Sequence, residues 1–145
     1  MHRFTSKEGL EFIKSFESFS PTTYICPAGY LTIGYGHVLL QGEYYQGISM
    51  DTAEDLLRRD LMRAERAVIR NICQPLEQNQ FDALVSFTYN LGCGALQRST
   101  LRQKVNYGAS PAEVRYEFMK WVYAGGQKLA GLVRRRRAEG DMFVA

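Results

Sequence analysis

Glu17 is the carboxyl group in this sequence with the best setting for acid chemistry. It follows an expected N-terminal helix and lies among the aromatic residues Phe16, Phe19 and Tyr24. Apolar neighbours disfavour the charged form of a carboxyl group, so this setting favours a side chain that holds a proton near neutral pH and donates it. A solvated glutamate at a helix end is the more frequent arrangement for this residue type. The rest of the sequence must decide between a proton donor and a solvated side chain.

Cys26 and Thr32 follow Glu17 and bring a thiol and a hydroxyl to the same segment. A free cysteine has an ordinary pKa of about 8.5 and is mostly protonated at neutral pH, although nearby cations lower the pKa of a thiol. The run Arg134 to Arg137 is a candidate source of such cations. Cys26 has three open roles: a thiolate that attacks or takes a proton from water, a neutral group that positions water, or an inert buried side chain. We expect a catalytic role.

The elements that position these groups begin with an amphipathic helix over residues 5–18. Leu10 and Ile13 face inward in its apolar pattern. Residues 24–37 then combine aromatic and β-branched side chains with Pro and Gly turns, which predicts a β-hairpin or a small sheet. Residues 40–48 have the character of a loop.

A long helix is expected over about residues 50–72. Ser49 caps it, and Asp51, Glu54 and Asp55 suit the positive end of its dipole. Its apolar residues recur at the spacing that forms one buried face of a helix. These residues are Ala53, Leu56, Leu57, Leu61, Ala64, Ala67, Val68 and Ile72.

Further helices complete the pattern. They cover about residues 81–88, 110–121 and 132–143. The first is apolar on most sides, so we expect it at the centre of the fold. The second starts at a capping box from Ser110 to Glu113, runs to Trp121 and is ended by Gly125 and Gly126. One small sheet followed only by helices predicts a mostly helical α+β fold.

Composition and charge limit the class of protein. The 145 residues are 46% hydrophobic and 23% charged, with a net charge of +3, which excludes a disordered chain. Three widely spaced cysteines fit neither a disulfide framework nor a zinc site, and free thiols are typical of a reducing compartment. The sequence contains no secretory signal pattern and no run of about 18 apolar residues. We therefore expect a protein that is made in a cytoplasm and is not inserted in a membrane.

The segment from Glu17 to His37 resembles the active-site segment of the phage lysozymes, glycoside hydrolase family 24. In that family a glutamate is followed nine residues later by an aspartate and six residues after that by a threonine in a T-I-G-x-G-H strand. Glu17 and Thr32 occupy the first and third positions, whereas Cys26 stands where most of the family has aspartate. The likeness continues in order through residues 53–61, 78–92 and 131–136.

The resemblance implies a role for the residues nearest the chemistry. Glu17 matches the general acid, and Thr32 matches the threonine that helps to hold water or the sugar across the cleft. Arg135, in the middle of the arginine run, is the cation expected to pair with the carboxylate of the acid. Consecutive residues point around the whole helix, so the other arginines either meet anionic wall polymers or remain solvated.

Four more residues match family positions that take no direct part in bond cleavage. His37 and Asp60 match a histidine and an aspartate that form a structural ion pair, so we interpret His37 as structural rather than catalytic. Tyr89 and Asn90 match positions that line the sugar cleft, where Tyr89 can stack on a sugar and Asn90 can bind its N-acetyl group. The alternative is that Tyr89 is a core residue and Asn90 a helix-end residue.

As a whole, the resemblance implies one lysozyme-like domain over residues 1–145, with two lobes around a cleft. The small lobe covers about 15–50, the connecting helix about 50–72, and the helical lobe about 73–145 plus the N-terminal helix. The implied activity is hydrolysis of the β-1,4 bond between N-acetylmuramic acid and N-acetylglucosamine in bacterial peptidoglycan, causing lysis of the host cell. No metal and no cofactor are implied.

Other functions remain open because Cys26 replaces the family aspartate. A lytic transglycosylase needs one acid and forms an anhydro sugar end, and a catalytically dead chain would only bind peptidoglycan. Nucleic acid is the competing partner for an arginine-rich helix, but the other basic residues alternate with acids, so we expect none. As an endolysin, the protein would be a monomer that waits in the host cytoplasm and reaches the wall through a membrane permeabilised by a holin.

Overall fold

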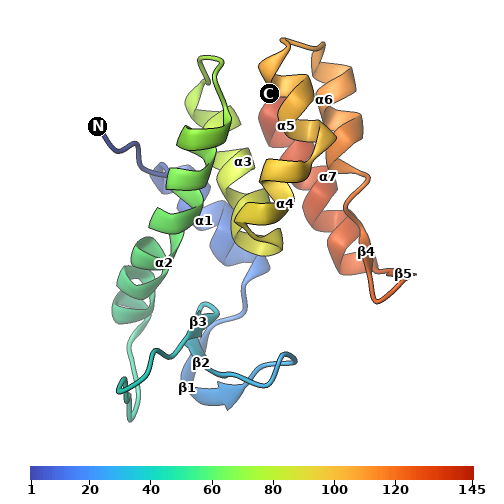
Figure 1. The fold of residues 1–145 in the computed structure, drawn as a ribbon. Coiled ribbons are helices and arrows are strands. Elements are labelled where there is room, and N and C mark those ends of the chain that lie inside the picture. The colour runs from blue at the N-terminus through green and yellow to red at the C-terminus, as the bar shows by residue number, and fades with distance from the viewer.

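The structure is a computed structural model that describes residues 1–145 (Figure 1). Helices form most of it, and a small antiparallel sheet lies near the N-terminus, so the predicted α+β class is confirmed. The helices are α1 (Lys7–Phe16), α2 (Met50–Asn71), α3 (Gln78–Leu91), α4 (Cys93–Arg98), α5 (Thr100–Asn106), α6 (Pro111–Phe118) and α7 (Ala130–Val144). The strands are β1 (Ser20–Ile25), β2 (Leu31–Gly34), β3 (His37–Val38), β4 (Tyr123–Ala124) and β5 (Gln127–Lys128).

Helix α1 carries Glu17 at its C-terminal end. It begins after Ser6, whose hydroxyl accepts a hydrogen bond from the backbone N–H of Gly9 at 3.0 Å. Leu10 and Ile13 are buried, as predicted. The helix is shorter than the predicted 5–18 because Ser6 caps one end and the backbone of Glu17 is extended (φ −101°, ψ 120°) at the other.

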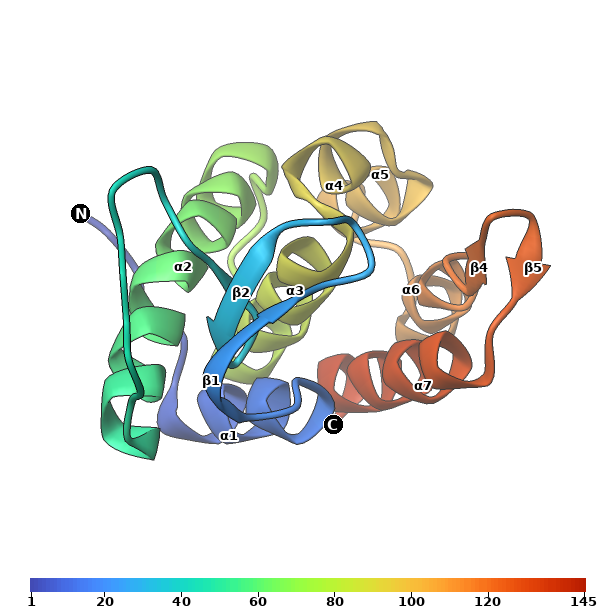
Figure 2. The same cartoon turned by 90° about the horizontal axis from the view of Figure 1, so that it is seen from below.

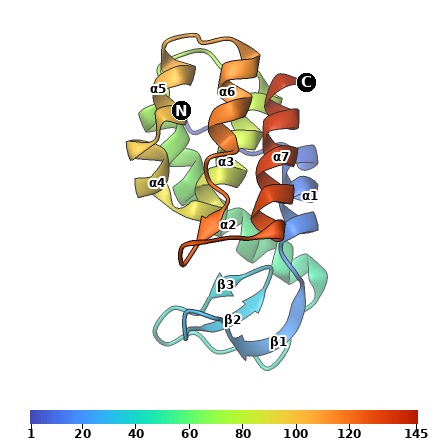
Figure 3. The same ribbon diagram turned by 90° about the vertical axis from the view of Figure 1, so that its right-hand side faces the viewer.

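The three-stranded sheet has the order β1-β2-β3 and lies at one end of the helical part (Figure 3). Tyr24 pairs with Thr32 across β1 and β2. A tight turn joins these strands, in which the N–H of Gly29 donates to the carbonyl of Cys26 at 2.8 Å. Gly29 has φ +91°, a conformation that glycine adopts without strain. The predicted hairpin is therefore confirmed, with a short third strand added.

Helix α2 runs from the sheet along the helical part (Figure 1). Ser49 caps it by accepting from the N–H of Thr52 at 3.1 Å, and all eight residues of the predicted apolar stripe are buried. Helix α3 is buried at every position from Phe81 to Thr88. Figure 2 shows α3 with α1, α2, α4 and α7 around it, as its apolar sequence predicts. None of the helices is long and apolar enough to cross a membrane.

Two predictions about the helical part are wrong in detail. Helix α6 ends at Phe118 instead of continuing to Trp121, and Gly125 and Gly126 form the turn between β4 and β5 instead of a helix end. Both glycines have positive φ, +58° and +79°, which a two-residue hairpin turn requires. The Ser110 hydroxyl does accept from the N–H of Glu113, at 3.3 Å, but the Glu113 carboxylate faces Lys104, so the capping box is only half formed.

Candidate active site

Glu17 lies next to Gly36, which lines a cavity of about 470 Å³ between the sheet and helices α2 and α3. Its side chain is 20% exposed. A Cβ atom on Gly36 would stand only 3.3 Å from Oε1 of Glu17 and 3.6 Å from the hydroxyl of Tyr89. Gly36 has φ +86°, so a glycine at this position allows the backbone to approach the acid without strain. The cavity is lined by Tyr30, Gly36, His37, Val38, Leu40, Arg59, Asp60, Arg63, Arg66 and Tyr89.

Arg135 holds the other oxygen of Glu17. Its Nη1 lies 2.5 Å from Oε2 of Glu17, and the guanidinium is packed at 5.4 Å from the ring of Phe16. Arg135 is only 4% exposed, and its Nε contacts Oε2 of Glu139 at 3.3 Å. The structure thus brings together Glu17 and Arg135, the two residues that the family resemblance pairs. One carboxylate oxygen of Glu17 is held by a buried cation, while the other lies near Gly36 in the cavity wall.

Cys26 directly follows β1, and Thr32 lies on β2. The backbone N–H of Tyr30 and then the hydroxyl of Thr32 act on the sulfur as hydrogen-bond donors, which lowers the pKa of the Cys26 thiol below its ordinary value. Cys26 is partly exposed, whereas Thr32 is 2% exposed, and its hydroxyl also lies 3.0 Å from the carbonyl of Tyr30. The run Arg134 to Arg137 is not among the groups that lower the pKa of Cys26. The local turn therefore makes the Cys26 thiol more acidic than a free cysteine.

Tyr89 and Asn90 lie in the last turn of helix α3, and Tyr89 lines this cavity. The hydroxyl of Tyr89 donates to the carbonyl of Tyr35 at 3.2 Å. Burial and then the nearby Glu17 carboxylate raise the pKa of Tyr89 above its ordinary value, so this hydroxyl remains protonated. Asn90 is exposed, and its Oδ1 accepts from Nη2 of Arg136 at 2.7 Å. That bond leaves the amide N–H groups of Asn90 without a partner in the chain.

His37 joins the sheet to helix α2. Its Nδ1 lies 2.8 Å from Oδ2 of Asp60, and its Nε2 lies 3.0 Å from Oε1 of Glu43. The imidazole is 6% exposed, and both ring nitrogens are occupied by carboxylates. Burial raises the pKa of Asp60, and His37 opposes that effect. The arrangement leaves His37 no free nitrogen for proton transfer to a substrate.

A comparison with known protein families matches the part of the chain that contains most of these residues. The family model described as "Phage lysozyme" matches residues 14–139, from the last turn of α1 to Glu139. The chain belongs to the phage lysozyme family. The matched range includes Glu17, the sheet that carries Cys26 and Thr32, and the part of α7 that carries Arg135.

Individual relatives agree with this family assignment. An endolysin of Bacillus phage B103 is 42% identical over 141 residues, covering 96% of this chain but only 53% of the relative, so the chain spans about half of that protein's length. An endolysin of Acyrthosiphon pisum secondary endosymbiont phage 1 is 39% identical, covering 95% of this chain and 96% of the relative. Among solved structures, the muramidase domain of SpmX from Asticaccaulis excentricus has a TM-score of 0.89 and 37% identity, covering 100% of this chain and 99% of that chain.

Several residues of this phage lysozyme site are absent from the predictions made from sequence. Glu139 and Ser86 lie beneath Arg135, and the hydroxyl of Ser86 donates to Oε2 of Glu139 at 2.6 Å. Glu139 follows Arg135 by four residues, a helical spacing that could have revealed the pair. Glu43, the second partner of His37, lies in the loop after β3, where its carboxylate accepts from the N–H of Leu40 at 2.6 Å. No local pattern in the sequence marks that contact.

The pKa of His37 leads to a prediction about stability. Burial acts to lower this pKa, but the carboxylates of Asp60 and then Glu43 outweigh burial and raise it above the ordinary value of about 6.5. A group whose pKa rises on folding stabilises the fold below its unfolded pKa, and this stabilisation is lost as the pH rises through its folded pKa. We therefore expect the free energy of unfolding of the wild type to fall as the pH rises from the unfolded to the folded pKa of His37. His37→Gln should remove this pH dependence and lower the free energy of unfolding by about 2 kcal/mol at pH 6.

Urea unfolding at several pH values from 5.5 upward checks this prediction. Asp60→Asn should flatten the slope more than Glu43→Gln, because the Asp60 bond contributes more to the raised pKa of His37. An unchanged slope in His37→Gln would show that other groups control the pH dependence of stability.

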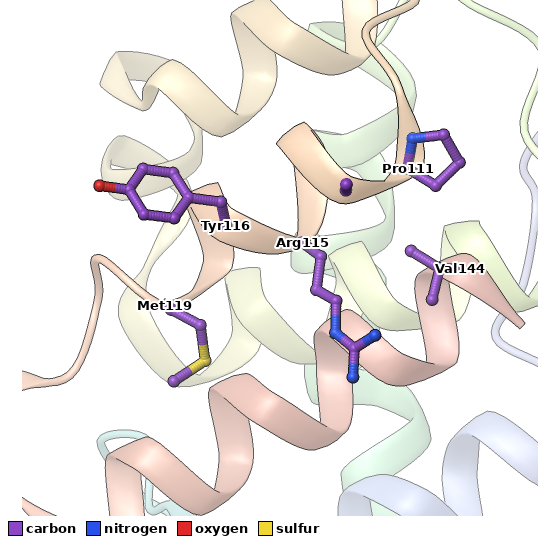
Figure 4. A pocket seen from close by; sticks show the side chains of 6 residues that line it. Pro111, Arg115, Tyr116, Met119 and Val144 are labelled. Carbon is purple, nitrogen blue, oxygen red and sulfur yellow. The ribbon is translucent and has the colours of Figure 1, made fainter.

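A second cavity, of about 440 Å³, does not share these features (Figure 4). It is lined by Pro111, Ala112, Arg115 and Tyr116 of α6, by Met119 and by Val144 of α7. Its one cation, Arg115, pairs with Asp141, and it contains no acid that faces an open space. No group of three or more His, Cys, Asp or Glu side chains is arranged to hold a metal ion. The cavity beside Glu17 is therefore the candidate active site.

Proposed function

We propose that this chain hydrolyses the β-1,4 bond between N-acetylmuramic acid and N-acetylglucosamine in bacterial peptidoglycan. The observation that carries the proposal is the placement of Glu17. One of its oxygens is held by the buried Arg135, and the other lies near Gly36, which lines the cavity together with Tyr89. Membership of the phage lysozyme family, together with relatives named endolysin and muramidase domain, supports the same activity.

In the proposed mechanism, Glu17 donates a proton to the oxygen of the leaving sugar, as a general acid. Arg135 then stabilises the carboxylate that remains. The Cys26 thiolate, supported by Thr32, takes a proton from a water molecule on the opposite face of the sugar. The oxygen of that water forms the new bond to the anomeric carbon, and the glycosidic bond breaks. A single attack from the opposite face inverts the configuration at that carbon.

Digestion of purified sacculi tests the proposed function. We expect the turbidity of the suspension to fall and new reducing ends to appear, with no retardation of DNA in a gel shift by the same preparation. Binding to sacculi without new reducing ends would indicate a protein that only binds peptidoglycan. A DNA shift without cleavage would favour the nucleic-acid alternative for the arginine-rich helix α7.

The role proposed for Cys26 gives its own prediction. A base at this position must be deprotonated, so we expect kcat/KM to rise as the pH passes through the pKa of the thiol. Cys26→Asp should stay active and move that rise to lower pH, because a carboxyl group has an ordinary pKa of about 3.9. Cys26→Ala should lose roughly 100-fold in kcat. The measurement is the release of reducing ends as a function of pH.

Cys73, an exposed cysteine far along the chain, supplies the matched control. Cys73→Ala should keep the wild-type rate and the wild-type pH profile. If Cys26→Ala is as active as Cys73→Ala, Cys26 is inert in the reaction, and water must be activated by another group.

We further propose that the chain is a monomeric endolysin that lyses the host cell. Its residues 1–145 form one domain, with the sheet lobe and the helical lobe on either side of the cleft. The protein waits in the host cytoplasm and reaches the wall when a holin permeabilises the membrane. Support for these statements comes from the family and from relatives that are named endolysins.

A further inference from the structure

Three arginines lie on one face of helix α2, and we call them the α2 arginine stripe: Arg59, Arg63 and Arg66. They follow one another at spacings of four and three residues, which places them side by side on a helix. All three are exposed. No carboxylate oxygen lies within 4.0 Å of their guanidinium nitrogens. The neighbouring acids on the helix are already bound, Asp60 to His37 and Glu65 to His2 and Thr5. Arg59 also contacts the hydroxyl of Tyr45, but none of the three arginines has a carboxylate partner, so the stripe can bind an anion from solution.

The α2 arginine stripe lines the same 470 Å³ cavity as Tyr89 and Gly36, and Gly36 lies next to Glu17. The opposite wall comes from the sheet and its loop, and its side chains Tyr30, Val38 and Leu40 are exposed. The cavity thus has one cationic wall and one largely apolar wall. A chain that enters it must present anionic groups on one side and flat or apolar groups on the other.

Arg63 extends this cationic wall beyond the first cavity. It also lines a neighbouring cavity of about 280 Å³, together with Tyr89, Gly92 and Cys93. The two cavities share Asp60, Arg63 and Tyr89, so the wall is continuous past the end of helix α3. An elongated ligand bound along the cleft would meet more than one of the three arginines.

We propose that the α2 arginine stripe binds the free carboxylates of the stem peptides on the peptidoglycan strand that occupies the cleft. This inference rests on the proposed function, because it requires a peptidoglycan strand beside Glu17. Each muramic acid of that strand carries a peptide with carboxylates that are ionised at neutral pH. A guanidinium group binds such a carboxylate through two parallel hydrogen bonds. We consider nucleic-acid phosphate a less suitable ligand, because the stripe lines the cavity beside Glu17, where the proposed function places a peptidoglycan strand.

The test compares two substrates and three proteins. The substrates are soluble peptidoglycan fragments with free stem carboxylates and the same fragments after conversion of those carboxylates to amides with carbodiimide and ammonia. The proteins are the wild type, Arg59→Gln/Arg63→Gln/Arg66→Gln, and the control Lys7→Gln/Lys128→Gln/Arg137→Gln. The control removes three exposed cations that form no ion pair and lie outside the cavity. Circular dichroism checks that all three proteins are folded.

We expect the wild type and the control to show a KM about tenfold lower for the free-acid fragments than for the amidated fragments, as three exposed ion pairs would give. The stripe variant should bind both substrates with the higher KM. Equal KM values for both substrates in the wild type, or an equal loss in the control, would overturn the inference while leaving the proposed function in place. DNA retardation that depends on the stripe, without this KM difference, would overturn it in favour of phosphate binding. A wild type that cleaves neither substrate would instead refute the proposed function.

Discussion

Replacing Glu17 by glutamine is expected to lower kcat for peptidoglycan cleavage about a thousandfold. Glutamine keeps the shape of the side chain and an oxygen that can accept from Nη1 of Arg135, but its amide is not acidic and cannot transfer a proton to the leaving sugar. The leaving sugar must then depart without protonation. The rate of reducing-end release at saturating substrate measures this loss, and KM should change much less, because the shape of the site is retained.

Glu8→Gln is the matched control for this substitution. Glu8 lies in the first turn of the same helix, is exposed and forms no ion pair, so the same chemical change there removes only its favourable interaction with the helix dipole. We expect wild-type kcat for Glu8→Gln. A Glu17→Gln variant that is folded and keeps more than about a tenth of the wild-type kcat would exclude Glu17 as the general acid.

The largest loss of stability is expected at Glu139. This carboxylate is fully buried and accepts from Ser86, and it also contacts Arg135 and Arg136, which are 4% and 0% exposed. Burial raises the pKa of Glu139 and lowers that of Arg136, so each charge depends on the other. Glu139→Leu would leave the buried Arg136 without a counter-ion and Arg135 with Glu17 alone. We expect a loss of about 3–5 kcal/mol in the free energy of unfolding and a Tm lower by roughly 10 °C.

Chemical and thermal unfolding of two further variants give this prediction its controls. Glu113→Leu removes an exposed carboxylate that is 4.0 Å from Lys104, and it should change the stability by less than about 1 kcal/mol. Arg136→Met combined with Glu139→Leu should recover part of the loss, because an apolar pair replaces the buried charges. A Glu139→Leu protein as stable as Glu113→Leu would show that the buried cluster does not stabilise the fold.

Local patterns in the sequence predict the elements that bury a continuous face. Helix α2 is an example, because Ser49 caps it and its apolar residues recur at helical spacing. The β4–β5 hairpin has no such pattern, since its strands have two residues each and are exposed. A Gly-Gly pair is as typical of a helix end as of a hairpin turn. Only the tertiary structure decides that Gly125 and Gly126 form the turn.

In the candidate active site, too, tertiary packing decides what the local sequence leaves open, namely which arginine of α7 faces Glu17. Four consecutive arginines point around the whole of α7, and the sequence alone does not select the one that faces Glu17. The rotation of α7 is set by packing, including the close approach of Gly140 to Arg115 on α6. That rotation places Arg135 against Glu17 and Arg136 against Asn90. The family resemblance named Arg135, but nothing in the sequence points to the bond between Arg136 and Asn90.

The masses of the muropeptides released from sacculi test the central claim most directly, because they report the bond that is cut and the fate of water. The proposed mechanism predicts fragments that end in a hydrated, reducing N-acetylmuramic acid, formed by the wild type and by Cys26→Asp and formed about a thousandfold more slowly by Glu17→Gln. Fragments with an anhydro end, one water lighter, would contradict hydrolysis and assign a lytic transglycosylase. Equal release by Glu17→Gln and the wild type would contradict the role of Glu17.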